Sequence, residues 1–271
     1  MPTRVALVAD THLSYRSPEC VANWHAARRA VERLAADLTV HLGDITLDGQ
    51  NEPDELEFAA PLVRSWPTEM RCIPGNHDLG DGSGEAAIDG RRIAAYESLF
   101  GSGRWALRRG RWHLVGIDAQ LLGSASGQEA AQWSWLEEVA RTIAAGEHAV
   151  LFTHRPLVRP SAGEADRHGR YADGAAAERL LGEVFGSHLR LVVSGHTHQA
   201  LDFSAGGVRH VWVPSAGFVI GDDEQRRVGE KVVGLGVLEL DADGAAFDLW
   251  CPDGMVRHEL ARLQVRQPAP R

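Results

Sequence analysis

The fold is decided by one stretch near the start of the chain, Val5-Ala6-Leu7-Val8-Ala9-Asp10-Thr11-His12. A short apolar run bounded by polar residues is typical of a strand that is buried on both faces. Asp10 and His12 follow directly after this run, where the strand would end. The stretch therefore predicts a buried strand that delivers two polar side chains to its carboxyl end.

The same alternation of strand and helix recurs in the segment that follows. The predicted elements are a helix over 20–36, a strand over 38–42, a helix near 54–64 and a strand over 71–73. The polar strand ends at Asp10, Asp44 and Asn76 are spaced at intervals close to the roughly 30 residues of a βαβ unit. We therefore expect them to meet at one edge of an open α/β sheet, where such sheets bind ligands.

The alternation continues through the middle of the chain, after which only strands are indicated. The middle elements are a strand pair at 105–107 and 113–117, a helix over 132–145, a strand over 150–152, a helix over 173–186 and a strand over 189–193. After residue 199 the pattern predicts antiparallel sheet, because Gly and Asp turns separate strand-like runs at 208–213, 232–240 and 246–250. We expect a single domain over residues 1–265 and a C-terminal tail over 266–271.

Charge and cysteine content narrow the class of protein. The formal net charge is -9 at pH 7, so the surface as a whole repels polyanions, and neither a nucleic-acid nor a membrane partner is expected. Cys20, Cys72 and Cys251 are few and far apart, which favours reduced thiols over a disulfide framework. The apolar run near the start is too short for a signal sequence or a membrane span. We therefore expect a cytoplasmic protein.

Histidines are concentrated in short motifs that also contain Gly, Asp or Asn. The motifs are Asp10-x-His12, Gly43-Asp44, Gly75-Asn76-His77-Asp78, a lone His154 and Gly195-His196-Thr197-His198. Each motif by itself has a second interpretation as ordinary turn chemistry or as an incidental histidine. All five, however, occur in order, and each stands at the end of a predicted strand. We interpret them jointly as a metal site, because imidazoles and carboxylates are common metal ligands.

These motifs resemble the complete signature of the calcineurin-like metallophosphoesterase superfamily over residues 10–198. The resemblance implies an α/β fold in which two packed mixed β-sheets are flanked by helices, an α/β/β/α sandwich. It also implies a centre of two divalent metal ions that share Asp44. One ion would be held by Asp10, His12, Asp44 and His198, and the other by Asp44, Asn76, His154 and His196.

The implied ligand set narrows the choice of metal and suggests a mechanism. Mixed imidazole and oxygen ligands favour Mn, Fe, Zn or Co over Ca or Mg. With Asp10 and Asp44 as the only anionic ligands, two divalent ions keep a net positive charge that attracts phosphate. Two ions roughly 3.5 to 4 Å apart can hold a bridging hydroxide as the nucleophile for in-line displacement. We therefore expect two divalent ions as cofactors, with Mn, Fe and Zn left open.

His77 lies inside the third motif but is not itself a ligand in the family. The resemblance implies that it is the catalytic general acid, which protonates the leaving alkoxide. Asp78 and Asp48 are two alternatives for the residue that orients it. Two neighbouring features also have two interpretations. Arg155 contacts either phosphate or a surface carboxylate, and the loop over 159–171 either covers the site or is a solvated charged loop.

The helix start near Gly127-Gln128 and the Gly-His-Thr-His ending resemble bacterial class III cyclic-nucleotide phosphodiesterases. The leading hypothesis is a phosphodiesterase whose substrate is a small phosphate ester of the cyclic-nucleotide or glycerophosphodiester type. A phosphomonoesterase with the same site is the first alternative. A catalytically silent scaffold is the second, although scaffolds of the superfamily lose ligands and this chain keeps all seven. The oligomeric state is left open, with a homodimer as one alternative.

Overall fold

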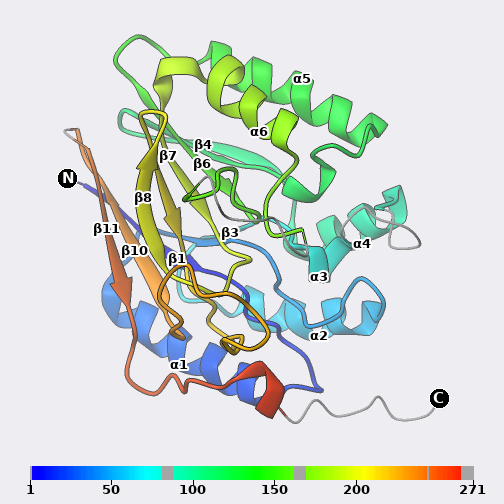
Figure 1. Ribbon diagram of the computed structural model, residues 1–271. Coiled ribbons are helices and arrows are strands. Elements are labelled where there is room, and N and C mark those ends of the chain that lie inside the picture. Colours follow the sequence, from blue (N-terminus) through cyan, green and yellow to red (C-terminus); the bar gives the residue numbers. More distant parts are fainter. Residues whose placement is uncertain (1, 81–87, 162–168, 243, 264–271) are drawn as a thin grey trace.

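The computed structural model describes residues 2–80, 88–161, 169–242 and 244–263, so the predicted tail at 266–271 lies outside the described residues. Two mixed β-sheets pack face to face, and helices cover the outer face of each sheet (Figure 1). The predicted α/β/β/α sandwich is thereby confirmed. None of the helices in the described part of the chain has the length and hydropathy that a membrane crossing requires.

The first sheet is built around the strand at the start of the chain. Its order is β11-β10-β1-β2-β3, in which β1, β2 and β3 are parallel and the other two pair antiparallel. The strands are β1 Thr3–Val8, β2 Leu38–His41, β3 Met70–Cys72, β10 Leu235–Leu240 and β11 Ala245–Trp250. Parallel neighbours end side by side, so the loops that follow β1, β2 and β3 meet at one edge.

The second sheet has the order β4-β5-β6-β7-β9-β8. Its strands are β4 Trp105–Arg109, β5 Trp112–Gly116, β6 His148–Thr153, β7 Leu189–Ser194, β8 Leu201–Ala205 and β9 Val208–Trp212. The four central strands are parallel, and the edge strands β4 and β8 are antiparallel. The antiparallel pairing predicted after residue 199 holds for β8–β9 and β10–β11, but these hairpins belong to different sheets, and β9 pairs in parallel with β7.

Local signals set where the helices begin and end. The helices are α1 Pro18–Leu34, α2 Pro53–Arg64, α3 Asn76–Leu79, α4 Gly90–Phe100, α5 Gly127–Arg141 and α6 Gly174–Arg179. Shorter turns are the π turn Leu180–Val184 and the 3-10 turns Ala119–Leu121, Gly186–His188 and Leu260–Arg262. The Ser126 hydroxyl accepts the N–H of Glu129, so α5 begins at Gly127, as the helix start near Gly127-Gln128 indicates, and not at residue 132. Helix α4 was not predicted; Tyr96 is its one buried residue, and Ile93 and Phe100 on the same face are only partly buried against the core.

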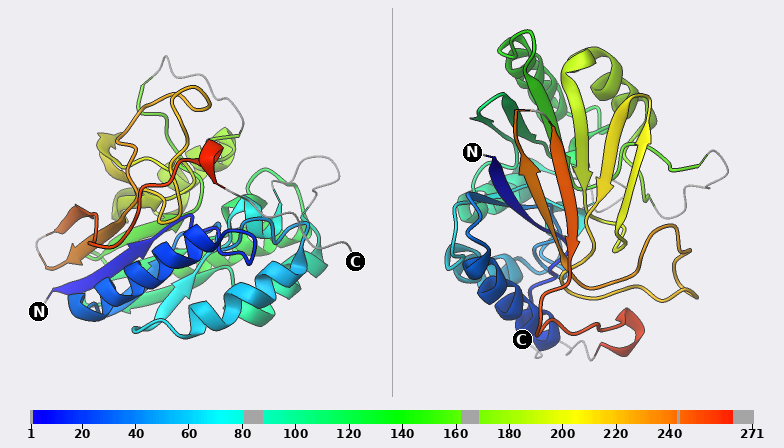
Figure 2. Two further views of the ribbon diagram at one scale, coloured as in Figure 1. Left: turned by 90° about the horizontal axis from the view of Figure 1, so that it is seen from below. Right: turned by 90° about the vertical axis from the view of Figure 1, so that its left-hand side faces the viewer.

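Alternation along the strands divides the apolar core into three layers. Val5 and Leu7 of β1 point between the sheets and pack with Phe152 of β6. Ala6 and Val8 point the opposite way, toward α1 and α2. A third cluster fills the space between the second sheet and the pair α5 and α6 (Figures 1 and 2). Each fully buried Val, Leu or Phe contributes roughly 1.5–3 kcal/mol, so the strands are held firmly enough to support strained loops at their ends.

Candidate metal centre

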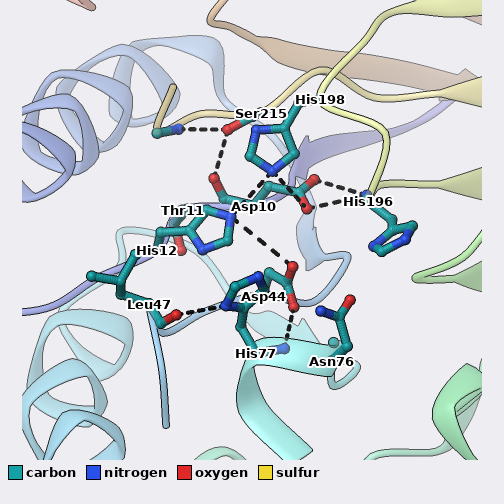
Figure 3. A network of polar contacts seen from close by, with 12 residues as sticks. Asp10, Thr11, His12, Asp44, Leu47, Asn76, His77, His196, His198 and Ser215 are labelled. Carbon is teal, nitrogen blue, oxygen red and sulfur yellow. Dashed lines mark hydrogen bonds and ion pairs between the residues drawn. The ribbon is translucent and has the colours of Figure 1, made fainter. Parts of the chain in front are cut away.

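All seven residues predicted as metal ligands lie beyond the carboxyl ends of parallel strands, and Figure 3 shows six of them. They come from both sheets: Asp10 and His12 follow β1, Asp44 follows β2, Asn76 follows β3, His154 follows β6, and His196 and His198 follow β7. In the described residues, three groups have all donor atoms within 4.8 Å of one another: Asp10-His12-His198, Asp44-His154-His196 and His12-Asp44-His77. The first two groups fall within the two ligand sets implied by the family resemblance.

The backbone turns sharply where these side chains are presented. Left-handed φ angles between 47° and 67° occur at five of the predicted ligands: Asp10, His12, Asp44, His196 and His198. Elsewhere in the described part of the chain, the non-glycine residues with positive φ are Ala35 and Ala125. Such a conformation costs a residue with a side chain on the order of 1–3 kcal/mol. Strain is therefore concentrated at this centre.

The carboxylate of Asp78 fastens the loop after β2 to the loop after β3. It accepts the main-chain N–H groups of Ile45 at 3.2 Å, Thr46 at 2.9 Å and Gly75 at 2.9 Å. Gly75 has to lack a side chain, since a Cβ there would lie 2.1 Å from Oδ1 of Asp44. The two loops can approach this closely because a glycine and a shared carboxylate lie between them.

Main-chain carbonyl groups fix the rings of two histidines. Nδ1 of His154 lies 2.7 Å from the carbonyl oxygen of Leu42, and Nδ1 of His198 lies 2.8 Å from that of Phe218. A carbonyl oxygen only accepts hydrogen bonds, so each Nδ1 carries the hydrogen. In the neutral ring, Nε2 then presents a lone pair to the centre. A carbonyl behind the imidazole is the usual support for a metal-binding histidine.

Nε2 of each of these two rings lies against further polar atoms of the centre. Nε2 of His154 lies 3.2 Å from Oδ1 of Asn76 and 3.4 Å from Oδ2 of Asp44. Nε2 of His198 lies 3.2 Å from Nε2 of His12. Acceptors buried at these distances repel one another unless a proton or a metal ion lies between them. The donor set therefore fits divalent cations, although its role as ligands stays a prediction.

Burial and mutual charge shift the pKa values at the centre. Burial lowers the pKa of His12 and His196 well below the usual range, and that of His198 to about 4. Burial also opposes the protonation of His154, but the carboxylate of Asp44 outweighs it and raises the pKa of His154 to about 9. In the metal-free protein, a proton on His154 is thus the cation that balances Asp44, and a metal ion has to displace it.

His77 faces the same centre from the loop after β3. Its Nδ1 lies 2.6 Å from the carbonyl oxygen of Leu47, and its ring packs edge-on to that of His12 at 4.8 Å between centroids (Figure 3). The Leu47 carbonyl therefore orients the ring and leaves Nε2 for the centre. The prediction that Asp78 or Asp48 orients His77 is wrong, because the main-chain carbonyl of Leu47 makes this contact.

The centre opens into a cleft of about 980 Å³. One side is lined by Asp44, His77, His196 and His198. The other is lined by Ile220, residues 222–227 and Leu260, a side that sequence reasoning missed. Arg170 also lines the cleft, so the described end of the loop over 159–171 does reach the site. Arg167 and His168 of that loop lie outside the described residues.

The model of the calcineurin-like phosphoesterase family matches residues 3–200. The chain belongs to this family. The resemblance seen in the motifs is confirmed, and the family places the chain among hydrolases of phosphate esters. Such a phosphoesterase typically binds two divalent metal ions, and the His and Asp clusters described above could hold them.

The sequence is also similar to those of named bacterial phosphodiesterases. The 3',5'-cyclic adenosine monophosphate phosphodiesterase CpdA of Escherichia coli is 25% identical over 221 residues, which cover 78% of this chain and 75% of that one. A probable cyclic nucleotide phosphodiesterase of Psychrobacter arcticus is 24% identical over 214 residues, which cover 72% and 73% of the two chains.

Solved structures share the fold at lower identity. A purple acid phosphatase from yellow lupin superposes with a TM-score of 0.67 at 14% identity over 95% of this chain, which spans about half (53%) of that structure. A dimetal phosphatase from Danio rerio superposes with a TM-score of 0.63 at 13% identity over 93% of this chain and 100% of that one. At these identities the likeness establishes the fold alone.

Proposed function

We propose that this phosphoesterase hydrolyses a small phosphodiester with two divalent metal ions. The observation that carries the proposal is the central position of Asp44, whose Oδ2 lies 4.0 Å from Nε2 of His12 and 3.4 Å from Nε2 of His154. One carboxylate can therefore serve two cation positions. In this proposal the ligand sets are Asp10, His12, Asp44 and His198 for one ion, and Asp44, Asn76, His154 and His196 for the other. When bound, two such ions supply positive charge and an activated water for attack at phosphorus.

The part played by His77 follows from its orientation. Its Nδ1–H donates to the carbonyl of Leu47, so the protonated ring presents Nε2–H toward Asp44 and the cleft. A leaving alkoxide on that side would take this proton and depart as an alcohol. The main-chain N–H of His77 also donates to Oδ1 of Asp44 at 2.9 Å. This hydrogen bond fixes the position of the proposed acid relative to the proposed bridging ligand.

A diester is the proposed substrate for two reasons. The named relatives from E. coli and P. arcticus are a cyclic adenosine monophosphate phosphodiesterase and a probable cyclic nucleotide phosphodiesterase, and the match covers about three quarters of each. The cleft of about 980 Å³ is also at the upper end of the range for sites that enclose whole small molecules. It has room for an ester substituent as well as for phosphate.

The test combines elemental analysis with hydrolysis assays of the protein loaded with Mn, Fe, Zn or Co. We expect two metals per chain, faster hydrolysis of bis(p-nitrophenyl) phosphate than of p-nitrophenyl phosphate, and a loss of at least about tenfold in metal affinity or rate for Asn76→Ala. Asn51→Ala is the matched control, because the Asn51 side chain is exposed and donates a hydrogen bond to Asp48 outside the centre. A preference for the monoester would indicate a phosphomonoesterase, and inactivity with every metal would indicate a silent scaffold.

A further inference from the structure

The far side of the cleft is built from a part of the chain that the family match does not reach. The match ends at residue 200, whereas this side is lined by Leu260, Ile220 and residues 222–227. The segment 220–229, to which all of these except Leu260 belong, is here called the cleft wall. The C-terminal segment is attached beside it, because the N–H of Leu260 donates to the carbonyl of Val219 at 2.9 Å. Figure 2 shows this C-terminal segment next to the connection between β9 and β10.

Lys231 holds the cleft wall from behind. It is the single lysine among the 271 residues, and its side chain is 1% exposed. The ammonium group donates to the carbonyl oxygens of Gly221 at 3.1 Å and Gln225 at 2.5 Å, and it pairs with Oδ1 of Asp222 at 2.9 Å. These three acceptors use all three of its N–H groups. The planar fork of an arginine could not supply three donors around one point.

Gln199 holds the same wall from the side of the metal centre. It directly follows His198 in sequence and is fully buried. Its Oε1 accepts the main-chain N–H groups of Val228 at 2.7 Å and Gly229 at 2.8 Å. Its Nε2 donates to the side chain of Gln225 and to the carbonyl of Arg226. All four hydrogen bonds that this amide can make are therefore made to the cleft wall.

A loop without regular secondary structure is ordinarily mobile, but a fully satisfied buried polar network holds its shape. We propose that Gln199 and Lys231 are positioning residues that keep the cleft wall fixed, and that this wall determines how large an ester substituent the metal centre accepts. The inference rests on the proposed function, since it concerns the substrate of the same site. Its physical basis is that Ile220 and Arg226 line the cleft and belong to the loop that Gln199 and Lys231 hold.

Chemical labelling tests whether the wall is held in solution. Because the chain has one lysine, acetylation by an N-hydroxysuccinimide ester at residue 231 can be followed by mass spectrometry of a single peptide. We expect Lys231 in the folded protein to react at least about a hundredfold more slowly than in the chain unfolded in guanidinium, and Gln199→Leu to accelerate it about tenfold. Arg4→Met is the control, because it removes an ion pair with Glu239 at the far end of β1. Labelling as fast as in the unfolded chain would overturn the proposal.

Kinetics test whether the wall selects the substituent. The substrates are methyl p-nitrophenyl phosphate and the p-nitrophenyl ester of thymidine 5′-phosphate, which differ in the size of one substituent. In Lys231→Met we expect kcat/KM for the larger ester to fall about tenfold more than for the smaller one, mainly through KM, and Lys231→Arg not to restore it. Hydrolysis with an unchanged ratio would overturn the specificity role alone. No hydrolysis of either diester by the metal-loaded wild type would overturn the proposed function and this role with it.

Discussion

The metal side of the cleft and the cleft wall use buried polar groups in opposite ways. On the metal side, carbonyl groups fix His154 and His198 so that their Nε2 atoms face further side chains of the centre, and either a proton on His154 or a metal ion has to balance Asp44. In the wall, every donor of Lys231 and Gln199 has its own acceptor within the protein. A buried polar cluster whose carboxylates need an exchangeable proton or a metal ion indicates a binding site, whereas a cluster satisfied by fixed partners within the protein indicates structural support.

The backbone shows the same contrast. Five proposed ligands adopt left-handed φ angles, while none of residues 220–229 has a positive φ. The metal side therefore carries local strain that the packed strands beneath it support, and the wall carries none of this kind. We therefore expect changes on the metal side to abolish turnover, and changes behind the wall to alter only which substrate is turned over.

The sharpest test of the contrast is the proposed bridging carboxylate. Asp44→Asn keeps the oxygen that accepts the N–H of His77 but removes the charge shared by the two cation positions. We expect kcat/KM for any substrate to fall at least about 10³-fold, with the second metal lost from elemental analysis. The rate of Lys231 acetylation should stay that of the wild type. A variant that keeps a tenth of the activity would rule out a bridging role for Asp44.

A smaller effect, dependent on the leaving group, is expected at His77. His77→Gln removes the proton donor, so hydrolysis of a diester with an alkoxide leaving group should slow about 10²-fold. The rate of hydrolysis of bis(p-nitrophenyl) phosphate should fall far less, because its leaving group, p-nitrophenolate, departs without protonation. The measurement is kcat for both substrates at equal metal loading. Equal losses on the two would show that His77 binds phosphate and does not act as the acid.

The smallest effect concerns pH. In the metal-free protein the pKa of His154 is raised from 6.5 to about 9, so its proton stabilises the fold fully below 6.5, and this contribution is lost as the pH rises through about 9. A metal ion competes with that proton. Affinity for Zn or Mn, measured by calorimetry, should therefore increase about tenfold from about pH 6.5 to about pH 7.5. The acetylation rate of Lys231 relative to that of a free lysine should not change between these pH values. If it changed together with the metal affinity, the metal side and the cleft wall would not be independent.

Much of the fold and the members of the centre could be predicted because their signals are local. A strand such as Val5–Ala9 is buried on both faces, so it reads as an unbroken apolar run, and Asp10 follows it directly. Helix α4 and strand β8 were not predicted, because half-exposed elements leave a weak apolar pattern. The cytoplasmic location and the homodimer alternative stay predictions.

By itself the sequence determined the family through its motifs and, through that resemblance, the two-sheet architecture. It also determined the set of polar residues that converge, because short apolar strands place whatever follows them at one edge. Only the tertiary structure decided how those residues are held. The carbonyl groups of Leu42, Leu47 and Phe218 orient three histidines from distant positions, and a main-chain carbonyl has no signature in sequence. Lys231 likewise acquires its role only when the wall folds around its ammonium group, since its acceptors are main-chain oxygens and one carboxylate brought together by the loop.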